Sequence, residues 1–544
     1  MIVAMPLVTP EIPAAEMARE LESFFAEFPQ AAVLEDGRVI FDMRLARYSL
    51  ASEQGRCLLH LWSEERNVVR TICGLQARRE SLRLETRRFG QTRPQVLELV
   101  PSSDRRTPST REAMRTRYLR VLERVLPHAF HGWTAEGFRT AADLEHSFGP
   151  AYARGVLTRG TGAWAVIAAN AEEPQTTIDG ILTLGILWLA HCREHGGGRR
   201  LFEGLRIIVP PGTARTTCAR LPWLNGAAAK WEVYELDERA EQLAQLDIRD
   251  GGNLHARLVY AFSADAALER FRAAIDYVSN LLRPGLRGAT EVRPRSATEI
   301  AFMLHGLEFA RIRHGLAAGS FARQDEITFG AGANETPLTP ENEKLFSELT
   351  GRLFKNRQGS GSRRNPLFRL QPERWLESVL RRDIEEIEPA LRGEIVYSQV
   401  PAFAAGDRGM LDLLTVTQAG RLAVLELKAD DSLHLPLQAL DYWSRVRQLQ
   451  GEHAFQKHGY FPGITLSDEP PLLYLVAPAL RIHPSTDVVL LHLSAEVQWE
   501  LIGLNEDWRK RRKVILRKRA VLRRLARVGR VAAYAWTGNP HSTW

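Results

Sequence analysis

Two carboxylates and a lysine in the C-terminal third of the chain are the residues whose types and spacing best suit chemistry. Asp412 stands in one short apolar run, and Glu426-Leu427-Lys428 ends the next. Residues two apart in a strand face the same side, so Glu426 and Lys428 point together, and Asp412 can reach the same spot from the partner strand of a hairpin. Mg²⁺ prefers carboxylates and water as ligands. The set therefore predicts a metal site that could hydrolyse a phosphodiester, because a bound metal polarises the phosphate and activates water.

Glu-x-Lys at the end of a strand is also common as a solvated edge with a weak ion pair, so the three residues do not suffice alone. Residues on the neighbouring elements add to the set. Glu377 lies in Arg374-Trp-Leu-Glu-Ser-Val-Leu380, a helical pattern before the strands. Gln438 and Tyr442 are four residues apart in the next helical segment and so share one face of it.

The order Glu377, Asp412, Glu426-x-Lys428, Gln438-x-x-x-Tyr442 resembles the PD-(D/E)XK nuclease superfamily, which has the restriction-endonuclease-like fold. The Gln-x-x-x-Tyr element resembles the RecB-like branch of that superfamily. The resemblance covers about a quarter of the chain. One departure is that Asp412 follows Gly-Met-Leu rather than a proline.

The resemblance implies a role for each of these residues. Asp412 and Glu426 would hold Mg²⁺ or Mn²⁺, with the carbonyl of Leu427 as a further ligand. Lys428 would be the catalytic lysine, which stabilises the charge that develops on the phosphate. Glu377 would complete the acidic cluster directly or through water. Gln438 and Tyr442 would brace the site or meet the nucleic acid.

The elements that must position these residues can be read from the same segment. We expect a domain over residues 364–508 in the order helix, three strands, helix, strand, which is the αβββαβ order of a restriction-endonuclease-like domain. Its expected elements are a helix at Arg374–Leu380, a strand at Glu394–Val400, a hairpin of Met410–Thr417 and Arg421–Leu427, and a helix at Pro436–Leu449.

The middle of the chain, residues 109–285, is interpreted as a degenerate α/β copy of that domain. Arg120-Val-Leu-Glu-Arg-Val-Leu126 parallels the segment around Glu377, and Glu123 lies as far before Thr158 as Glu377 lies before Asp412. In this alignment Thr158, Ala168 and Asn170 take the places of Asp412, Glu426 and Lys428. A site without its carboxylates cannot hold Mg²⁺, so the copy would keep the fold and lose the chemistry.

The rest of the chain completes an α/β protein of several domains, as 544 residues require. Residues 1–108 predict a β-rich N-terminal module. Residues 286–363 predict a helical connector, with amphipathic helices near Ala297–Arg313 and Pro340–Asn356, followed by a flexible linker at 358–365. Residues 509–544 form a basic extension.

The charge favours a polyanionic partner. The net charge is +7, and residues 509–530 contain twelve Lys or Arg and no acidic residue. Apolar residues interrupt this run, so we expect a basic amphipathic helix that binds nucleic acid, with a membrane surface as the rival partner. The residues assigned to nucleic-acid binding are Arg509, Lys510, Arg511, Arg512, Lys513, Arg517, Lys518 and Arg519.

Other sequence features narrow the function class. The four cysteines, Cys57, Cys73, Cys192 and Cys218, form no Cys-x-x-Cys pair, which favours a reducing compartment. With no signal-peptide pattern at the N-terminus, a cytoplasmic location is expected. No Gly-Lys-Ser/Thr phosphate loop occurs in the sequence.

Together these features predict a Mg²⁺-dependent deoxyribonuclease acting in repair, restriction or defence. An RNA-cleaving nuclease of the same fold and a non-catalytic nucleic-acid-binding scaffold are the alternatives. A homodimer or an accessory protein partner is left open.

Overall fold

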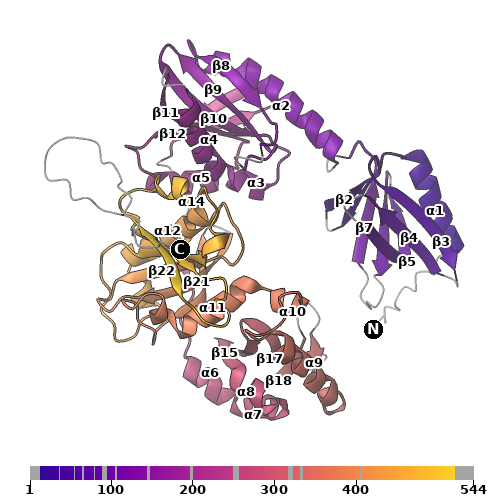
Figure 1. Cartoon of the computed structure of the whole chain (residues 1–544), viewed down its shortest axis with the longest axis vertical. Coiled ribbons are helices and arrows are strands. Elements are labelled where there is room, and N and C mark those ends of the chain that lie inside the picture. Colours follow the sequence, from indigo (N-terminus) through magenta and orange to yellow (C-terminus); the bar gives the residue numbers. More distant parts are fainter. Residues whose placement is uncertain are drawn as a thin grey trace, which may run out of the picture. The chain divides into compact units, whose positions relative to one another are not determined.

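The computed structural model describes residues 13–520, except for 36, 54–55, 64–66, 79, 88–94, 105–106, 144–146, 197–199, 249–255, 317–322, 331–334 and 405–406. The described residues form 14 α-helices and four β-sheets, a mixed α/β architecture (Figure 1). The chain divides into two compact units. One comprises Met1–Arg154, Ala169–Pro174 and Asp237–Gln242, and the other contains Gly155–Ala168, Gln175–Leu236 and Leu243–Trp544.

The N-terminal region is β-rich, as the sequence predicts. Its seven strands form one sheet in the order β2-β1-β7-β6-β5-β4-β3, and each neighbouring pair is antiparallel. Helix α1 buries Met17, Leu21, Phe24 and Phe25 in the core that it shares with the sheet. The elements are α1 (Ala14–Glu27), β1 (Ala32–Glu35), β2 (Arg38–Asp42), β3 (Arg47–Glu53), β4 (Arg56–Trp62), β5 (Asn67–Arg78), β6 (Ser81–Arg87) and β7 (Gln95–Val100).

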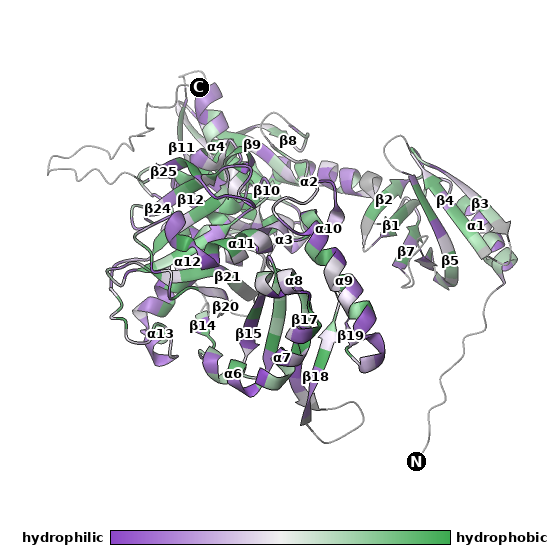
Figure 2. Cartoon of the chain, turned by 60° about the horizontal axis from the view of Figure 1, so that its bottom comes forward, coloured by the Kyte–Doolittle hydropathy of each residue, from purple (hydrophilic) through white to green (hydrophobic). Residues whose placement is uncertain are grey.

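The middle region contains a six-stranded sheet in the order β13-β12-β11-β10-β9-β8. Strand β10 is buried along almost its whole length, as expected for a strand inside a parallel sheet with a covering helix. Figure 2 shows this sheet mostly in hydrophobic colour. The elements are α2 (Pro108–Ala129), β8 (Thr134–Arg139), β9 (Tyr152–Arg159), β10 (Gly162–Ala169), α3 (Gln175–Asp179), α4 (Ile181–His195), β11 (Leu201–Val209), α5 (Arg215–Arg220), η1 (Leu221–Trp223), β12 (Lys230–Asp237) and β13 (Gln242–Gln245).

The prediction of a helix near Ala297–Arg313 is wrong. This segment contains β16 and β17, joined by a turn at His305-Gly306, in a sheet of order β15-β16-β17-β18-β19. Ile300, Phe302 and Leu304 alternate into the core with the two-residue period of a strand. If the turn is overlooked, Ile300, Leu304 and Leu307 fit the i, i+4, i+7 spacing of a helix. Gly306 has φ of +74°, which a side chain would oppose at this turn.

The second helix predicted for the connector is confirmed. Helix α9 follows a short 3-10 turn, and Thr339 and Asn342 form a capping box there. The elements of this region are β14 (Ala256–Leu258), α6 (Ala264–Arg270), α7 (Arg272–Leu281), α8 (Pro284–Ala289), β15 (Thr290–Ser296), β16 (Glu299–Leu304), β17 (Leu307–Leu316), β18 (Arg323–Phe329), β19 (Thr336–Pro337), η2 (Pro340–Asn342) and α9 (Glu343–Asn356).

The segment 358–365, predicted as a flexible linker, is a packed turn. A Cβ on Gly359 would lie 2.8 Å from the carbonyl oxygen of Arg509, so another chain segment fills the space beside it. Before the turn, the guanidinium of buried Arg357 donates to the carbonyl oxygens of Leu304, Leu370 and three other residues. These bonds tie the β15–β19 region to the segment that leads into α11.

The C-terminal region follows the order helix, three strands, helix, strand. Its sheet has the order β14-β20-β21-β22-β23-β24-β25, with β22, β23 and β24 parallel and β20, β21 and β22 antiparallel. The elements are α10 (Pro366–Arg369), α11 (Pro372–Arg382), η3 (Ile384–Glu386), β20 (Tyr397–Ala404), β21 (Asp407–Val416), β22 (Leu422–Leu427), α12 (Leu435–Gly451), α13 (Ala454–Lys457), β23 (Leu472–Pro478), η4 (Ala479–Arg481), α14 (Thr486–Leu490), β24 (Trp499–Leu504) and β25 (Val514–Arg519).

The basic run is not the predicted helix in its described part. Val514–Arg519 forms β25, an antiparallel edge strand on β24, and the remainder from residue 521 lies outside the described residues. Ladder hydrogen bonds to β24 hold this segment extended despite its helix-compatible pattern. Among the residues that the structure describes, no helix combines the length and the apolar character needed to cross a bilayer.

Candidate active site

The candidate site lies where the β21–β22 ladder opens. Regular pairing of the two strands reaches Leu413 opposite Leu425. One residue further, the side chain of Asp412 replaces the backbone as acceptor, because its Oδ2 receives the N–H of Leu427 at 3.0 Å. The site therefore sits at the end of the hairpin ladder, where a carboxylate side chain can stand between two strands.

Glu426 and Lys428 point together, as their two-residue spacing predicts. The Nζ of Lys428 lies 3.5 Å from Oε1 of Glu426 and 3.6 Å from Oε1 of Glu373 on α11. The side chain of Glu426 is 3% exposed, and its Oε2 has no hydrogen-bond partner in the described part of the chain. A buried carboxylate oxygen without a donor is costly, so this atom is suited to a cation.

Both carboxyl groups of the site have raised pKa values. Burial, helped by the charges of Glu377 and Glu373 and opposed by the N–H of Leu427 and the charge of Lys428, raises the pKa of Asp412 to about 6. Burial and the nearby Asp412 also raise the pKa of Glu426 well above its usual range. Burial opposes the charged form of Lys428, but Glu426, Glu373 and Asp412 outweigh it and raise the pKa of its ammonium. The lysine therefore stays cationic beside two carboxyl groups.

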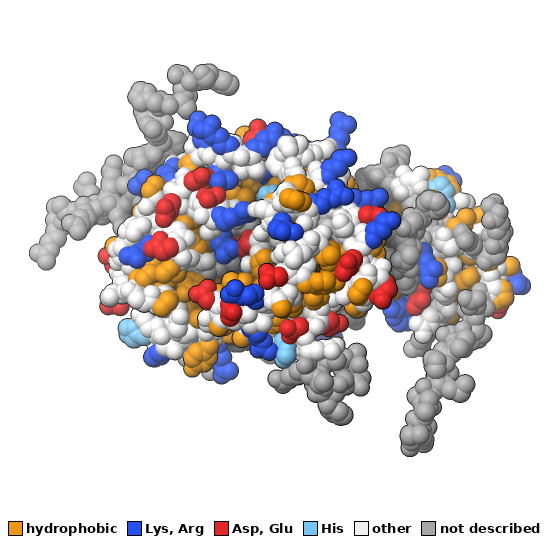
Figure 3. Space-filling view, turned by 90° about the horizontal axis from the view of Figure 1, so that it is seen from below, with side chains coloured by type: hydrophobic (Ala, Val, Ile, Leu, Met, Phe, Trp, Pro, Cys, Tyr) orange, Lys and Arg blue, Asp and Glu red, His pale blue; other side chains and the backbone are white. Residues whose placement is uncertain are grey.

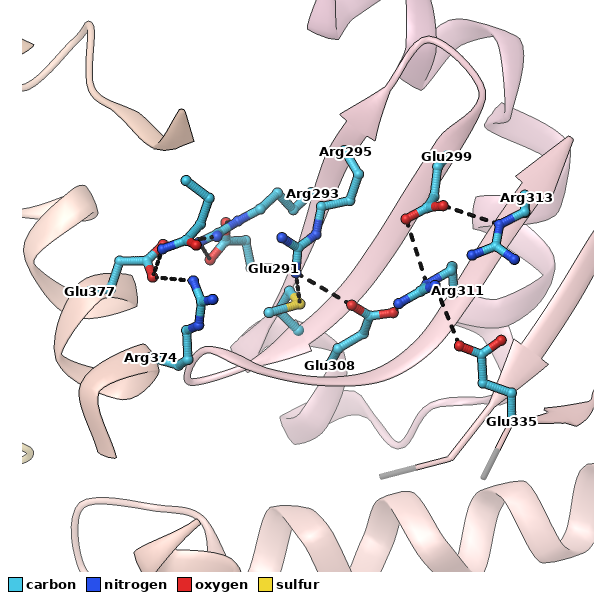
Figure 4. Close-up of polar contacts among 12 residues, drawn as sticks. Glu291, Arg293, Arg295, Glu299, Glu308, Arg311, Arg313, Glu335, Arg374 and Glu377 are labelled. Carbon is cyan, nitrogen blue, oxygen red and sulfur yellow. Dashed lines mark hydrogen bonds and ion pairs between the residues drawn. The ribbon is translucent and has the colours of Figure 1, made fainter. Parts of the chain in front are cut away.

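Glu377 is buried on α11 beside this pair, but its oxygens are already engaged. Oε1 accepts from Arg293 at 3.3 Å, and Oε2 accepts from Arg374 at 3.0 Å (Figure 4). Oε2 also accepts from Gln399 at 2.8 Å. The charge of Glu377 nevertheless contributes to the raised pKa of Asp412. Because its oxygens are engaged, Glu377 is better placed to act on Asp412 through its negative charge than to bind a metal ion directly.

Gln399 is a neighbour of the site that sequence reasoning missed. It faces the Asp412 position in β20, between the paired rungs Ser398–Leu413 and Val400–Leu411, and it has φ of +54°. Such a conformation is unusual for a residue with a side chain and marks a locally distorted strand. No sequence signal identifies it, because a strand glutamine with positive φ is set by the sheet around it.

Glu373 and Arg374 were also missed, although the sequence offers a signal for both. They precede Glu377 by four and three residues on α11, so they share its helix face. Arg293, the fourth residue missed, comes from β15, far away in sequence. Only the tertiary structure brings it to Glu377.

Gln438 and Tyr442 lie on α12, the helix after β22. Burial raises the pKa of Tyr442, and the charges of Glu426 and Asp412 raise it further, which places its hydroxyl in their field. The Oε1 of Gln438 is buried and has no donor among the described residues. Both side chains are therefore partly buried on the helix that follows β22.

The residues present fit a divalent cation in part. Within the described residues, no group of three or more His, Cys, Asp or Glu is arranged to hold a metal. Asp412 and Glu426 supply two carboxylates with raised pKa values, and Glu426 supplies an unpartnered oxygen. Mg²⁺ commonly binds through one or two carboxylates and completes its shell with water and substrate phosphate. This donor set therefore suits a Mg²⁺ or Mn²⁺ ion that keeps water ligands, rather than a structural metal ion enclosed by protein ligands.

The middle region carries none of this chemistry at the aligned positions. Ala168 and Asn170 are buried at the end of β10, and Thr158 is buried on β9. Asn170 uses its side-chain oxygen to accept the N–H of Glu172 at 2.9 Å. Glu123, the one acidic residue retained in the alignment, is exposed on α2, unlike Glu377.

The ladder registers of the two sheets agree at one rung and differ at the next. Ala168 pairs with Ile208, and Glu426 pairs with Leu475. Ile208 and Leu475 also correspond in sequence when the alignment of the two regions is continued, so that Leu205-Arg-Ile-Ile-Val-Pro210 parallels Leu472-Leu-Tyr-Leu-Val-Ala477. On the following strand, Trp231 pairs with Leu205, which corresponds to Leu472 in that alignment, whereas Trp499 pairs with Leu473. The register of β12 on β11 thus differs by one residue from the register of β24 on β23.

The eight basic residues assigned to nucleic-acid binding fall into two groups. Arg512, Arg517 and Lys518 form ion pairs within the domain, for example Arg512 with Asp383 at 2.7 Å. Arg509 is partly buried over the rings of Trp508, Phe368 and Trp375. The exposed members are Lys510, Arg511, Lys513 and Arg519. The first group serves packing, and the second remains open to a polyanion.

No model of a known protein family matches the chain, and no curated protein matches it.

Proposed function

We propose that this chain is a Mg²⁺- or Mn²⁺-dependent nuclease that hydrolyses phosphodiester bonds of DNA, with its active site at Asp412, Glu426 and Lys428 in a restriction-endonuclease-like domain. The observation that carries the proposal is the open end of the β21–β22 ladder, where buried Glu426, half-buried Asp412 and Lys428 converge. The element order of α11, β20–β22, α12 and β23 supports the fold assignment.

Each residue has a role that its surroundings support. Asp412 and Glu426 would hold the cation, with the carbonyl of Leu427 as a further ligand. When bound, the cation would polarise the phosphodiester and lower the pKa of a water molecule. Lys428, kept cationic by three carboxylates, would stabilise negative charge on the phosphate oxygens. Gln438 and Tyr442 would brace the site from α12.

The middle region is proposed as a degenerate copy that keeps the strand order of the active domain. Its sheet runs β8 to β13 as the C-terminal sheet runs β20 to β25. Without carboxylates at Thr158 and Ala168 it would bind no cation, so it would act as an intrachain partner of the active domain.

The test is a cleavage assay with labelled single- and double-stranded DNA and RNA, with and without Mg²⁺. We expect Mg²⁺-dependent cleavage of DNA that is lost in Asp412→Asn, Glu426→Gln and Lys428→Met, each of which preserves side-chain size. Cleavage of RNA alone would select the RNA nuclease. Cleavage of no substrate, together with retained binding, would select the non-catalytic scaffold.

Two glutamates supply a matched comparison within the same assay. Glu377→Gln should reduce cleavage, because it removes a buried charge that acts on Asp412. Glu123→Gln should leave cleavage unchanged, because Glu123 is exposed on a helix of the degenerate region. Equal loss in both variants would contradict the assignment of the site to the C-terminal domain alone.

A further inference from the structure

A cavity of about 300 Å³ lies beside the candidate site, between the β15–β18 strands and α11. Its charged lining comes from both sides, with arginines on β15, β17 and α11 facing one another (Figure 4). The charged residues that line it are Arg293, Arg295, Arg311, Arg374, Glu308, Glu335 and Glu377. Four guanidinium groups thus face three carboxylates, which leaves an excess of one positive charge.

The arginines that line the cavity differ in the number and length of the ion pairs that they form with carboxylates. Arg311 contacts Glu299, Glu308 and Glu335 and is fully engaged. Among the described residues, Arg295 makes one longer ion pair, at 3.3 Å to Glu308, and Arg374, which is 43% exposed, has one carboxylate partner, Glu377. Arg295 and Arg374 are therefore the two guanidinium groups best able to accept an incoming anion.

Burial and the neighbouring guanidinium groups both disfavour the charged form of Arg295. Burial lowers the pKa of Arg295, and Arg293 and Arg374 lower it further, against the opposing effect of Glu308. An anion between Arg295 and Arg374 would relieve the repulsion between these two groups. Guanidinium groups recognise phosphate oxygens through paired N–H donors, so phosphate is the anion that several converging arginines suit best.

The remaining lining leaves room beside the arginines. Met303, Leu307 and Phe329 form nearly buried apolar parts of the cavity wall, and Gly306 and Gly330 add no side chains to it. The cavity is larger than a phosphate group alone requires. Figure 3 shows acidic and basic side chains interspersed over the face seen from below, so anion binding depends on such local arrangements more than on one broad basic patch.

Glu377 connects the cavity to the candidate active site. It lines the cavity, where Arg374 and Arg293 hold it, and its charge reaches Asp412. We propose that the cavity binds the phosphate-bearing terminal nucleotide of a nucleic-acid strand, next to the site that cuts the backbone. This inference rests on the proposed function and deepens it, because it makes the substrate a strand with a phosphorylated end.

The test measures binding without cleavage. Fluorescence anisotropy in EDTA compares the full chain with three internally labelled oligonucleotides of one sequence, bearing a 5′-phosphate, a 3′-phosphate or hydroxyl groups at both ends. We expect one phosphorylated oligonucleotide to bind about tenfold more tightly than the hydroxyl-ended one, as hydrogen bonds to a charged group allow. Equal binding of all three would overturn the proposal.

Matched variants test whether the preference for a phosphorylated end arises from the cavity. Arg295→Gln should abolish it, whereas Arg313→Gln should keep it, because Arg313 on β17 pairs with Glu299 and does not line the cavity. Arg374→Gln provides a second test if Arg295→Gln fails to fold. Loss of the preference in Arg313→Gln to the same degree would show a general charge effect and overturn the proposal.

Competition separates strand ends from free nucleotides. A deoxynucleoside monophosphate that competes better than inorganic phosphate but more weakly than the phosphorylated oligonucleotide supports binding of the terminal nucleotide of a strand, and one that competes no better than inorganic phosphate would overturn the proposal. If it binds as tightly as the phosphorylated oligonucleotide, the cavity serves free nucleotides and the proposal is overturned. Because no step requires cleavage, failure of the proposed nuclease activity and failure of this end recognition would be observed separately.

Discussion

Arg220 of α5 and Asp441 of α12 form a two-pronged buried ion pair between the middle and C-terminal regions. Arg220 donates from Nε to Oδ1 of Asp441 at 2.8 Å and from Nη2 to Oδ2 at 2.7 Å, and a third N–H reaches the carbonyl oxygen of Asp179 at 2.6 Å. Asp441 directly precedes Tyr442 on the helix that borders the candidate site. The pair therefore anchors α12 to the proposed degenerate copy, and His434 at the start of α12 adds a 3.0 Å contact with Thr183.

Breaking this pair should destabilise the protein strongly. Arg220→Met leaves Asp441 partly buried without its cation, which should lower the free energy of unfolding by about 3–5 kcal/mol. The double variant Arg220→Met/Asp441→Leu should recover much of the loss, because no charge remains unpaired. Arg363→Met removes an exposed pair with Asp507 and should cost less than about 1 kcal/mol. Urea denaturation of the four proteins measures these differences, and similar losses for Arg220→Met and Arg363→Met would contradict the anchoring role.

The raised pKa of Asp412 predicts a pH-dependent loss of stability in the absence of divalent cations. Folding raises the pKa of this carboxyl group from 3.8 to about 6. The group therefore contributes its full stabilisation to the folded protein when the pH is below the pKa of the unfolded state. That stabilisation disappears as the pH rises through about 6. Relative to Asp412→Asn, the wild type should therefore lose on the order of 2–3 kcal/mol between pH 4 and pH 7 in EDTA. A difference in the free energy of unfolding that stays constant between pH 4 and pH 7 would show that folding does not raise the pKa of Asp412.

Divalent cations should stabilise the wild type above pH 6. An ion at about a hundred times its Kd contributes about 2.7 kcal/mol to the free energy of unfolding. Mg²⁺ or Mn²⁺ should raise the Tm of the wild type and leave that of Glu426→Gln nearly unchanged, because this variant loses one of the two carboxylates. Thermal unfolding with and without EDTA provides the measurement. An equal rise in both proteins would place the bound ion elsewhere.

The exposed basic residues of the C-terminal run should govern the salt dependence of DNA binding. Substituting Lys510, Arg511, Lys513 or Arg519 with Gln should reduce the slope of log K against log salt by about 0.9 for each phosphate of duplex DNA that is no longer neutralised. Arg512→Gln should change the slope less, because Arg512 is paired with Asp383 and Glu386. Point variants serve better here than truncation after Trp508, which would remove β25. An unchanged slope in all variants would assign this segment to another partner.

The sequence by itself determined the local elements of the C-terminal region. The apolar runs around Asp412 and before Lys428 are strands, and the helices that carry Glu377 and Tyr442 occur where the periodicity places them. The two-residue spacing was enough to orient Glu426 and Lys428 together. These features depend on near neighbours in the chain, so the local pattern contains the information.

The local pattern led to wrong predictions for two segments whose sequences are compatible with both a helix and a strand. The apolar residues from Ile300 to Ile312 fit a helix if the His305-Gly306 turn is overlooked, and the run after Arg509 fits an amphipathic helix although part of it pairs with β24. Backbone hydrogen bonds to strands far away in sequence decide both cases. A pattern of side chains does not reveal those partners.

Only the tertiary structure decided how the site is embedded. Gln399 adopts a positive φ because its strand is distorted opposite Asp412, and Arg293 reaches Glu377 from a sheet that precedes α11 by many residues. The burial that raises the pKa of Asp412 and Glu426 is likewise a property of packed elements. The sequence thus determined which groups could act together, whereas packing decided their charge, their partners and the arginine-lined cavity beside them.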